Sequence, residues 1–344
     1  CRDQPHGQYG GIGHGISHHH RRFWGRNSKC RCRKNRQTGE NRGALYHEAP
    51  QLMKRTLVLL ASLCFVITTQ AQDDLFDLLD QGQPTTQTVY ATFKGTQLIN
   101  AQTNETPGKG VLQYVISHRF GSFSDDYLYN FFGLDNAQIR MQLDYGINDR
   151  LNVGIGRSSV LKVTDGFVKY RALRQKTGDN AFPISLTLNS SFNYRGARYT
   201  DGIDHFISDR ISYHHSAIIA RKWNNKVSTI ISPTFVHWNL VPGPSDRNTT
   251  FHMTVGGRYK LNNRIALTGE YTLMNRQDLS NETQITAPGG IGIDIETGGH
   301  VFQFHLSNTR AMSTPYWLSR NSFSPLKGGI FLGFNISRVF TIKD

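Results

Sequence analysis

Apolar and polar residues alternate along most of the chain after residue 110. In "AQIRMQLDYGI", residues 137–147, polar side chains occupy one parity, and the other parity carries Ile139, Met141, Leu143, Tyr145 and Ile147. A period of two is the pattern of a β-strand with one apolar and one polar face. The same alternation recurs in residues 184–194, 249–260 and 265–274. The pattern therefore predicts strands that separate an apolar environment from a polar one.

Twelve segments are predicted as strands. Each is close to the length that crosses a bilayer when the strand is tilted. They are residues 110–120, 137–147, 151–160, 164–174, 184–194, 210–221, 227–238, 249–260, 265–274, 289–297, 300–309 and 327–341.

Short connections between these strands repeat one design. In "YGINDRLNVGIG", "ARKWNNKVSTII" and "RYKLNNRIALTG", the alternation stops at Asn with Asp or Asn, passes one basic residue and resumes. Asn, Asp and Gly supply the backbone conformations that tight hairpins need. The basic residues are Arg150, Lys226 and Arg264, so the repeating unit is a hairpin of about 38 residues. Longer polar loops alternate with the short turns, at residues 121–136, 195–209, 239–248, 275–288 and 310–326.

Short turns at one end and long loops at the other are typical of an outer-membrane barrel. After residue 71 there is no run of about 20 apolar residues, so a membrane-spanning form must be a closed barrel. We therefore predict an all-β fold, a transmembrane antiparallel up-and-down β-barrel of about twelve strands, over residues 110–344. A soluble secreted β-sandwich or barrel with its polar face outward is the alternative. Aromatic residues near strand ends favour the membrane form: Tyr114, Phe120, Tyr145, Tyr170, Tyr194, Tyr213, Tyr259 and Tyr271.

The chain before the barrel divides into three segments. Residues 53–71 combine Met53, a basic pair, an apolar core and a small-residue cleavage site, which together predict a cleaved signal peptide. Because a signal peptide starts a protein, residues 1–52 are interpreted as upstream sequence translated by mistake and disordered. Residues 72–109 are predicted to lie in the periplasm or to fold into the barrel mouth as a plug. Val89 to Ile99 within them has the pattern of a strand.

Net charge and cysteine content change once these segments are separated. Residues 1–52 carry +7, and Lys54 and Arg55 add two more, so only +5 of the chain's +14 remains for residues 72–344. A nucleic-acid partner is therefore not predicted. The cysteines are also confined to residues 1–71, which leaves no disulfide or thiol chemistry in the exported part.

Three stretches carry a family resemblance: "VLQYVISHRFG", "IETGGHVFQFHLSNT" and the terminal "GGIFLGFNISRVF". They resemble the Bacteroidota outer-membrane β-barrel family known as domain of unknown function 5777. The resemblance covers most of residues 88–340. It implies a barrel in the outer membrane of a Gram-negative cell, and it implies no reaction or ligand.

The polar parity of the predicted strands supplies the candidate functional residues. These side chains are expected to line the lumen, and six of them are basic while two are acidic. An excess of Arg and Lys favours anionic solutes, whereas a salt-bridged interior that only stabilises the wall is the alternative. The lumen-lining candidates are Arg119, Arg140, Asp144, Lys169, Arg171, His214, His252, Arg258, Lys260, Glu270 and His305.

These residues predict passage or binding of a small polar solute, and their basic excess favours an anionic one. The alternatives are a non-conducting barrel that supports a periplasmic partner through residues 72–109, and an outer-membrane lipase-like enzyme. No nucleophile-elbow motif is present, so an enzyme is not predicted. His214 and His215 are neighbours on one strand and point to opposite faces, so they do not share a metal. No catalytic, cofactor-binding or metal-binding residue is assigned. The expected partners are outer-membrane lipid and the barrel-assembly machinery.

Overall fold

The computed structural model describes residues 86–122, 128–244, 246–274 and 285–342. All of these residues belong to one compact unit, Gln81–Asp344. The predicted upstream segment, the predicted signal peptide and residues 72–85 of the lead segment lie outside the described residues.

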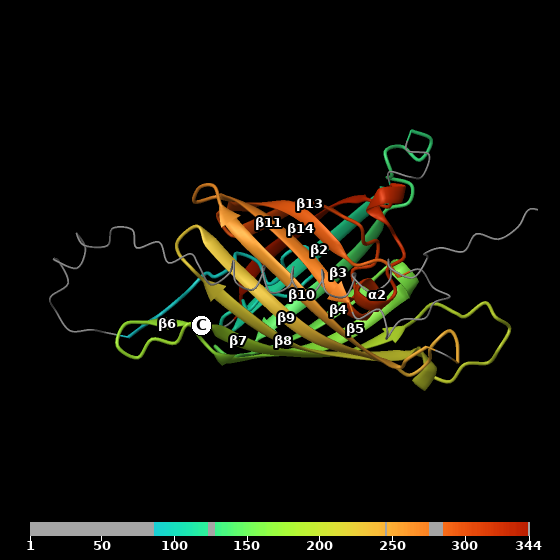
Figure 1. Ribbon diagram of the computed structural model, residues 1–344, viewed down its shortest axis with the longest axis horizontal. Helices are drawn as coiled ribbons and strands as arrows, with labels where there is room; N and C mark the ends of the chain where they lie inside the picture. Colours follow the sequence, from blue (N-terminus) through green and yellow to red (C-terminus); the bar gives the residue numbers. More distant parts are fainter. Residues whose placement is uncertain (1–85, 123–127, 245, 275–284, 343–344) are drawn as a thin grey trace, which may run out of the picture. The chain divides into compact units, whose positions relative to one another are not determined.

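Twelve antiparallel strands close into a barrel (Figure 1). Each strand pairs with the next barrel strand along the sequence, and β14 closes the ring on β2. The predicted antiparallel up-and-down barrel of about twelve strands is therefore confirmed. The strands are β2 (Val111–Ser122), β3 (Gln138–Gly146), β4 (Leu151–Ser158), β5 (Val163–Leu173), β7 (Ser185–Arg195), β8 (Ile211–Lys222), β9 (Val227–Trp238), β10 (Thr249–Lys260), β11 (Ile265–Met274), β12 (Gly289–Thr297), β13 (His300–Ser307) and β14 (Phe331–Thr341).

Alternate side chains of each strand point outward and inward. Leu143 and Leu188 on the outside are 42% and 46% exposed, whereas their neighbours Gln142 and Thr187 are 2% and 0% exposed. The apolar rows therefore form the outer wall, and the polar rows face the interior. A soluble sandwich would bury the apolar rows against each other, so the soluble alternative is wrong.

The two ends of the barrel differ in their connections. We call the end with the connections at residues 147–150, 223–226, 261–264 and 298–299 the turn end, and the opposite end the loop end. The turn at Glu296–His300 uses Gly298 and Gly299, whose φ angles are +26° and +108°. Only glycine adopts such angles without strain. At the loop end, β4 and β5 are joined by a short 3₁₀ turn, η1 (Val160–Lys162), and η2 (Ser208–Arg210) precedes β8.

A small second sheet lies at the turn end. There, β1 (Gln87–Thr88) pairs antiparallel with β6 (Lys176–Thr177), which belongs to the connection between β5 and β7. Val89 continues this contact by donating its backbone N–H to the carbonyl of Gln175 at 2.9 Å. The segment that precedes the barrel is therefore attached to the barrel wall at the turn end.

Residues 91–106, which we call the lumen hairpin, do not form the predicted strand. The backbone folds back on itself, with Leu98 N–H bonded to the carbonyl of Ala101 at 2.9 Å and an isolated bridge between Gln97 and Gln102. The prediction of a strand over Val89 to Ile99 is wrong, because β1 ends at Thr88 and only an isolated bridge at Gln97 follows. All twelve barrel strands already have two neighbours, so no sheet edge is available to this segment, and wall side chains satisfy its backbone instead.

A short helix enters the barrel from the loop end. Helix α2 (Thr314–Ser319) lies within the loop between β13 and β14 (Figure 1). All its residues after Thr314 are buried. Another short turn, η4 (Pro325–Lys327), delays the start of β14 to Phe331, four residues later than predicted. Within the described residues, no helix has the length and apolar character needed to cross a bilayer.

Candidate functional site in the barrel lumen

The structure places all eleven predicted lumen residues on the inward parity of their strands. Nine are buried, and two, Arg171 and Lys260, are half-buried near the turn end. The structure does not gather them into one cluster. Instead, most of them contact the lumen hairpin or a polar network on the wall.

Glu270 on β11 binds the tip of the lumen hairpin. Its carboxylate accepts hydrogen bonds from the backbone N–H groups of Ile99, Asn100 and Ala101 at 3.2, 2.9 and 3.0 Å. The side-chain amide of Asn100 donates a fourth bond at 3.0 Å. Hydrogen bonds to an ionised acceptor are stronger than those between neutral groups. One wall residue therefore satisfies three consecutive backbone donors that have no strand partner.

Two further wall residues bind the acceptors of the same tip. Arg119 donates through Nη2 to the carbonyl of Ile99 at 3.3 Å and to Oδ1 of Asn100 at 3.0 Å. Asn335 on β14 donates to the same Ile99 carbonyl at 3.1 Å. The tip is therefore held through donors and acceptors together, by side chains from β2, β11 and β14.

The arms of the hairpin contact wall residues closer to the turn end. Lys169 on β5 donates from Nζ to the carbonyl of Glu105 at 2.9 Å and to Oε1 of Gln102 at 3.2 Å. On the other arm, Arg258 donates to the carbonyl of Ala91 at 3.1 Å. The contacts of both arms use side chains of the wall, as at the tip.

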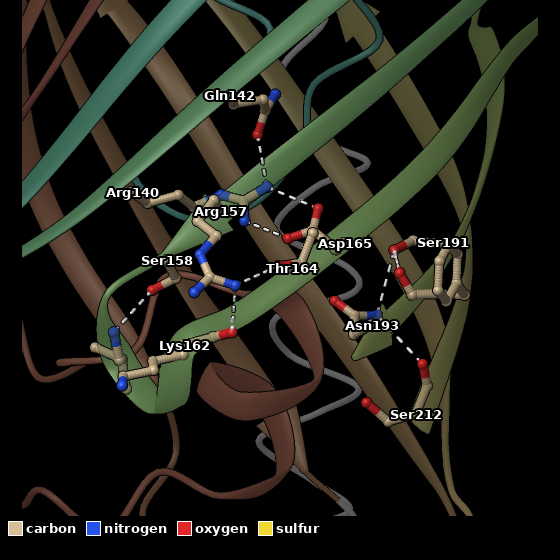
Figure 2. Close-up of polar contacts among 12 residues, drawn as sticks. Arg140, Gln142, Arg157, Ser158, Lys162, Thr164, Asp165, Ser191, Asn193 and Ser212 are labelled. Atoms are coloured by element: carbon tan, nitrogen blue, oxygen red, sulfur yellow. Dashed lines mark hydrogen bonds and ion pairs between the residues drawn. The ribbon is translucent and has the colours of Figure 1, made fainter. Parts of the chain in front are cut away.

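The second polar network lies on β3 and β5 (Figure 2). Arg140 forms a two-point ion pair with Asp165, in which Nη1 contacts Oδ1 and Nη2 contacts Oδ2 at 2.8 Å. Gln142 accepts from Arg140 at 2.9 Å and donates to Asp144 at 2.8 Å. A bidentate Arg–carboxylate pair fixes both side chains, so this network rigidifies the wall beside the hairpin.

The buried charges of the described residues are balanced. The sequence pattern indicated six basic and two acidic candidates, and it missed two acids that share the inward parity of their strands, Asp165 and Asp294. Extending the alternation along β5 and β12 would have found both. The expected excess of basic residues is absent from this buried set, which contains Arg119, Arg140, Lys169, Arg258, Asp144, Asp165, Glu270 and Asp294.

The predicted histidines lie apart from one another. His214 pairs with Asn189 at 3.1 Å, and Nε2 of His252 lies 2.8 Å from the hydroxyl of Thr250. His305 is buried on β13. In the described part of the chain, no group of three or more His, Cys, Asp or Glu side chains is arranged to hold a metal ion.

One side of the lumen is apolar. Ile218, Ile230 and Val236 on β8 and β9 are buried in a cluster that also contains residues of both inserted segments. The lumen hairpin supplies Phe93, Leu98 and Ala101 to it, and α2 supplies Tyr316, Trp317 and Leu318. Burial raises the pKa of Tyr316 to about 12. The two segments thus share one hydrophobic core inside the barrel, which no alternation pattern in the strands could predict.

The apolar outer surface of β7 and β8 carries a polar pair. Ser190 Oγ lies 2.8 Å from Nδ1 of His215, beside a hollow of about 450 Å³ lined largely by apolar side chains such as Phe235. β7 and β8 are paired in register from Ser185 to Tyr194. The β8–β9 ladder is paired on both sides of Ala217 and Ile218 but not at these two residues. Ser190 and His215 themselves face each other within the paired β7–β8 ladder, which does not aim N–H donors together at one point as an oxyanion hole does.

A family model described as "Membrane bound beta barrel domain (DUF5777)" matches residues 93–340. No curated protein matches the chain. Among solved structures, the NanC porin is similar over 68% of this chain and 100% of its own, with 10% identity and a TM-score of 0.41. An outer-membrane channel from Pseudomonas putida F1 gives 69% and 97% coverage, 13% identity and a TM-score of 0.41.

Outer membrane phospholipase A from Escherichia coli is similar over 68% of this chain and 91% of its own, with 10% identity and a TM-score of 0.38. Because none of these three TM-scores reaches 0.5, no solute or reaction is transferred from these proteins.

Proposed function

Since the chain belongs to the DUF5777 family of membrane-bound β-barrel domains, we propose that it forms a passage for small polar solutes which the lumen hairpin keeps closed at rest. The observation that carries this proposal is the way in which wall side chains bind the hairpin tip, with Glu270, Arg119 and Asn335 replacing a strand partner. We place the barrel in the outer membrane, as the family description and the predicted signal peptide support, with the turn end in the periplasm.

Hydrogen bonds between wall side chains and the hairpin backbone allow the hairpin to withdraw from the lumen. Water can replace a side-chain partner at modest net cost, about 0.5–1.5 kcal/mol for each bond. The barrel ladder does not include residues 91–106, so withdrawal of the hairpin leaves the strands intact. It would uncover polar inward side chains such as Gln142 and Thr187, which bond to Gln97 and Asn104 of the hairpin, and these side chains suit a polar solute.

The apolar core shared with α2 favours a second candidate, the non-conducting barrel. Phe93, Leu98 and Ala101 lose buried contacts if the hairpin leaves, at roughly 25 cal/mol for each Å² of apolar surface exposed to water. Under this candidate the hairpin is a permanent part of the interior, and the barrel serves a periplasmic partner.

Conductance in planar bilayers tests both candidates. The exported part lacks cysteine, so Asn100→Cys and Thr309→Cys, whose native side chains are 3.1 Å apart, can be bridged by a short bis-maleimide, which adds one thiol to each of its two double bonds. We expect a wild-type barrel that is mostly silent, Glu270→Ala to give frequent current steps, and the bridge introduced into Glu270→Ala to abolish them.

Thr254→Val is the matched control, because Thr254 lies on the inner wall and bonds to Thr272 at 2.9 Å rather than to the hairpin. Current steps that persist after bridging would contradict closure by the hairpin. Folded barrels that stay silent in every variant would contradict the passage and support the scaffold.

A further inference from the structure

Several basic side chains outside the buried interior line two neighbouring clefts at the turn end. A cleft of about 840 Å³ lies there, and its lining includes Arg150, Arg171, Arg174 and Lys176 together with two acids, Asp149 and Asp179. A second cleft of about 610 Å³ lies beside it. It shares Lys176 with the first, adds Arg221 and Lys222, and has no acidic residue in its lining. We call the two together the basic mouth.

The structure fixes part of the basic mouth in place. Arg174 donates to the backbone carbonyl of Asp149 at 2.8 Å, and its guanidinium lies 5.8 Å from the ring centre of Tyr90. Lys222 donates to the carbonyl of Tyr90 at 3.1 Å. The acceptors in these contacts are uncharged, so the contacts do not neutralise the positive charge of Arg174 or Lys222.

The remaining cations have little compensation. Arg171 lies 3.8 Å from Glu105 of the lumen hairpin, which is a loose ion pair. Among the described residues, neither the guanidinium of Arg150 nor the ammonium of Lys176 has a hydrogen bond or ion pair. Guanidinium groups present paired donors that match carboxylate and phosphate oxygens. These two cations, beside the two that are fixed, therefore form a site with unused donors for an anion.

We propose that the basic mouth binds a small solute bearing a phosphate or carboxylate group. This proposal names the class of solute for the proposed passage. Anion binding at the basic mouth does not depend on that passage, but the conclusion that the bound anion is the transported solute rests on the proposed function. The location supports this assignment, because β1 crosses the mouth and leads directly into the lumen hairpin. The second cleft has only basic residues among its charged lining, and charges of one sign raise the local concentration of counter-ions, so an anion would gather where the chain enters the barrel.

Equilibrium binding to the purified full barrel in detergent tests the site without any need for conduction. The probes are inorganic phosphate and succinate, with glucose as the neutral control. The test variant is Arg150→Gln with Lys176→Gln. The matched control is Lys109→Gln with Lys226→Gln, which removes two exposed cations from the same end outside both clefts.

We expect saturable binding of at least one of the two anions, none of glucose, and a loss of about tenfold in affinity in the test variant, which corresponds to about 1.4 kcal/mol. The control variant should change affinity by less than about twofold. Binding of phosphate alone or succinate alone identifies the group that the site prefers. No saturable binding of either anion, or an equal loss in both variants, would overturn the site while leaving the hairpin-gated passage untouched.

Discussion

Asn100, at the tip of the lumen hairpin, donates a hydrogen bond from Nδ2 to the hydroxyl of Thr309 at 3.1 Å. These two residues are 209 positions apart in the chain, and they belong to segments that enter the barrel from opposite ends. Around this contact, residues of the hairpin and of α2 complete a single apolar cluster. The interior is therefore occupied by two segments that pack against each other, so displacement of the lumen hairpin removes contacts from α2.

Release of the hairpin tip should be measurable as solvent access. Ala101→Cys places a thiol where the native residue is 4% exposed, so we expect slow reaction with a soluble maleimide. Adding Glu270→Ala leaves three buried backbone donors without their acceptor. We expect labelling to become at least about tenfold faster, since a buried donor left without its acceptor costs about 1–3 kcal/mol. Equal labelling rates with and without Glu270→Ala would show that Glu270 does not hold the tip.

The Arg140–Asp165 pair should be sensitive to removal of one partner. Arg140→Ala leaves the carboxylate of Asp165 buried without its two-point contact. A buried charge that loses its partner destabilises a protein by about 3–5 kcal/mol. The midpoint of urea-induced unfolding of the barrel in lipid vesicles should fall accordingly. The double variant Arg140→Leu with Asp165→Leu should lose less stability than Arg140→Ala, and a larger loss would contradict the explanation from unpaired charge.

A charged substitution on the outer wall should destabilise the barrel more when the residue lies deeper in the bilayer. Leu188, the fourth of the eleven residues of β7, points outward and is 46% exposed. Leu188→Arg should lower the free energy of unfolding in vesicles by about 2–4 kcal/mol. The matched control is Leu261→Arg, because Leu261 is exposed on a turn beyond β10, where the same substitution should cost about 0–1 kcal/mol. Equal costs at the two positions would mean that Leu188 does not face lipid.

The loop before β8 should respond to acid through one carboxylate. His205 Nε2 lies 2.7 Å from Asp201, and this hydrogen bond lowers the pKa of Asp201 below its ordinary value. A lowered acid pKa means that the contact stabilises the loop above the unfolded pKa and is lost as pH falls through the folded pKa.

His205→Phe keeps an aromatic ring against Tyr199, on which His205 stacks at 3.9 Å, and removes the hydrogen bond. Carboxyl-carbon NMR titration should show the pKa of Asp201 rising in this variant. An Asp201 pKa that is the same in both proteins would show that His205 does not control it. Tyr199→Leu, which removes the stacked ring and leaves the bond, should change the pKa much less.

The lipase-like alternative should fail an activity test. Ser190 and His215 have the separation of a nucleophile and its base, but they face each other within the paired β7–β8 ladder, which does not converge N–H donors on one point. We expect no phospholipid hydrolysis by the purified barrel above that of Ser190→Ala. Hydrolysis by the wild type that Ser190→Ala removes would establish an enzyme and contradict a purely passive role for the barrel.

The local chemistry of the wall could be predicted from sequence because it is repeated in every strand. Alternation in residues such as Gln142 and Leu143 reports that one face contacts lipid and the other contacts polar groups, and this holds for each strand by itself. The turns were equally local, since Asn148 and its counterparts accept hydrogen bonds from backbone N–H groups only two and three residues later. Strand number, direction and the inward parity of Glu270 or Lys169 followed from these patterns.

What fills the barrel was decided only by tertiary structure. The segment from Val89 to Ile99 has the period of a strand, yet a closed barrel offers no edge for it to pair with, so Glu270 and Arg119 supply its partners from strands far along the chain. Helix α2 also depends on tertiary contacts. Its six residues are too few for a helical pattern to be recognised in the sequence, and packing rather than helix propensity stabilises them. Sequence periodicity records which side of a strand meets lipid, but the occupancy of the enclosed space depends on contacts between distant residues that no local pattern contains.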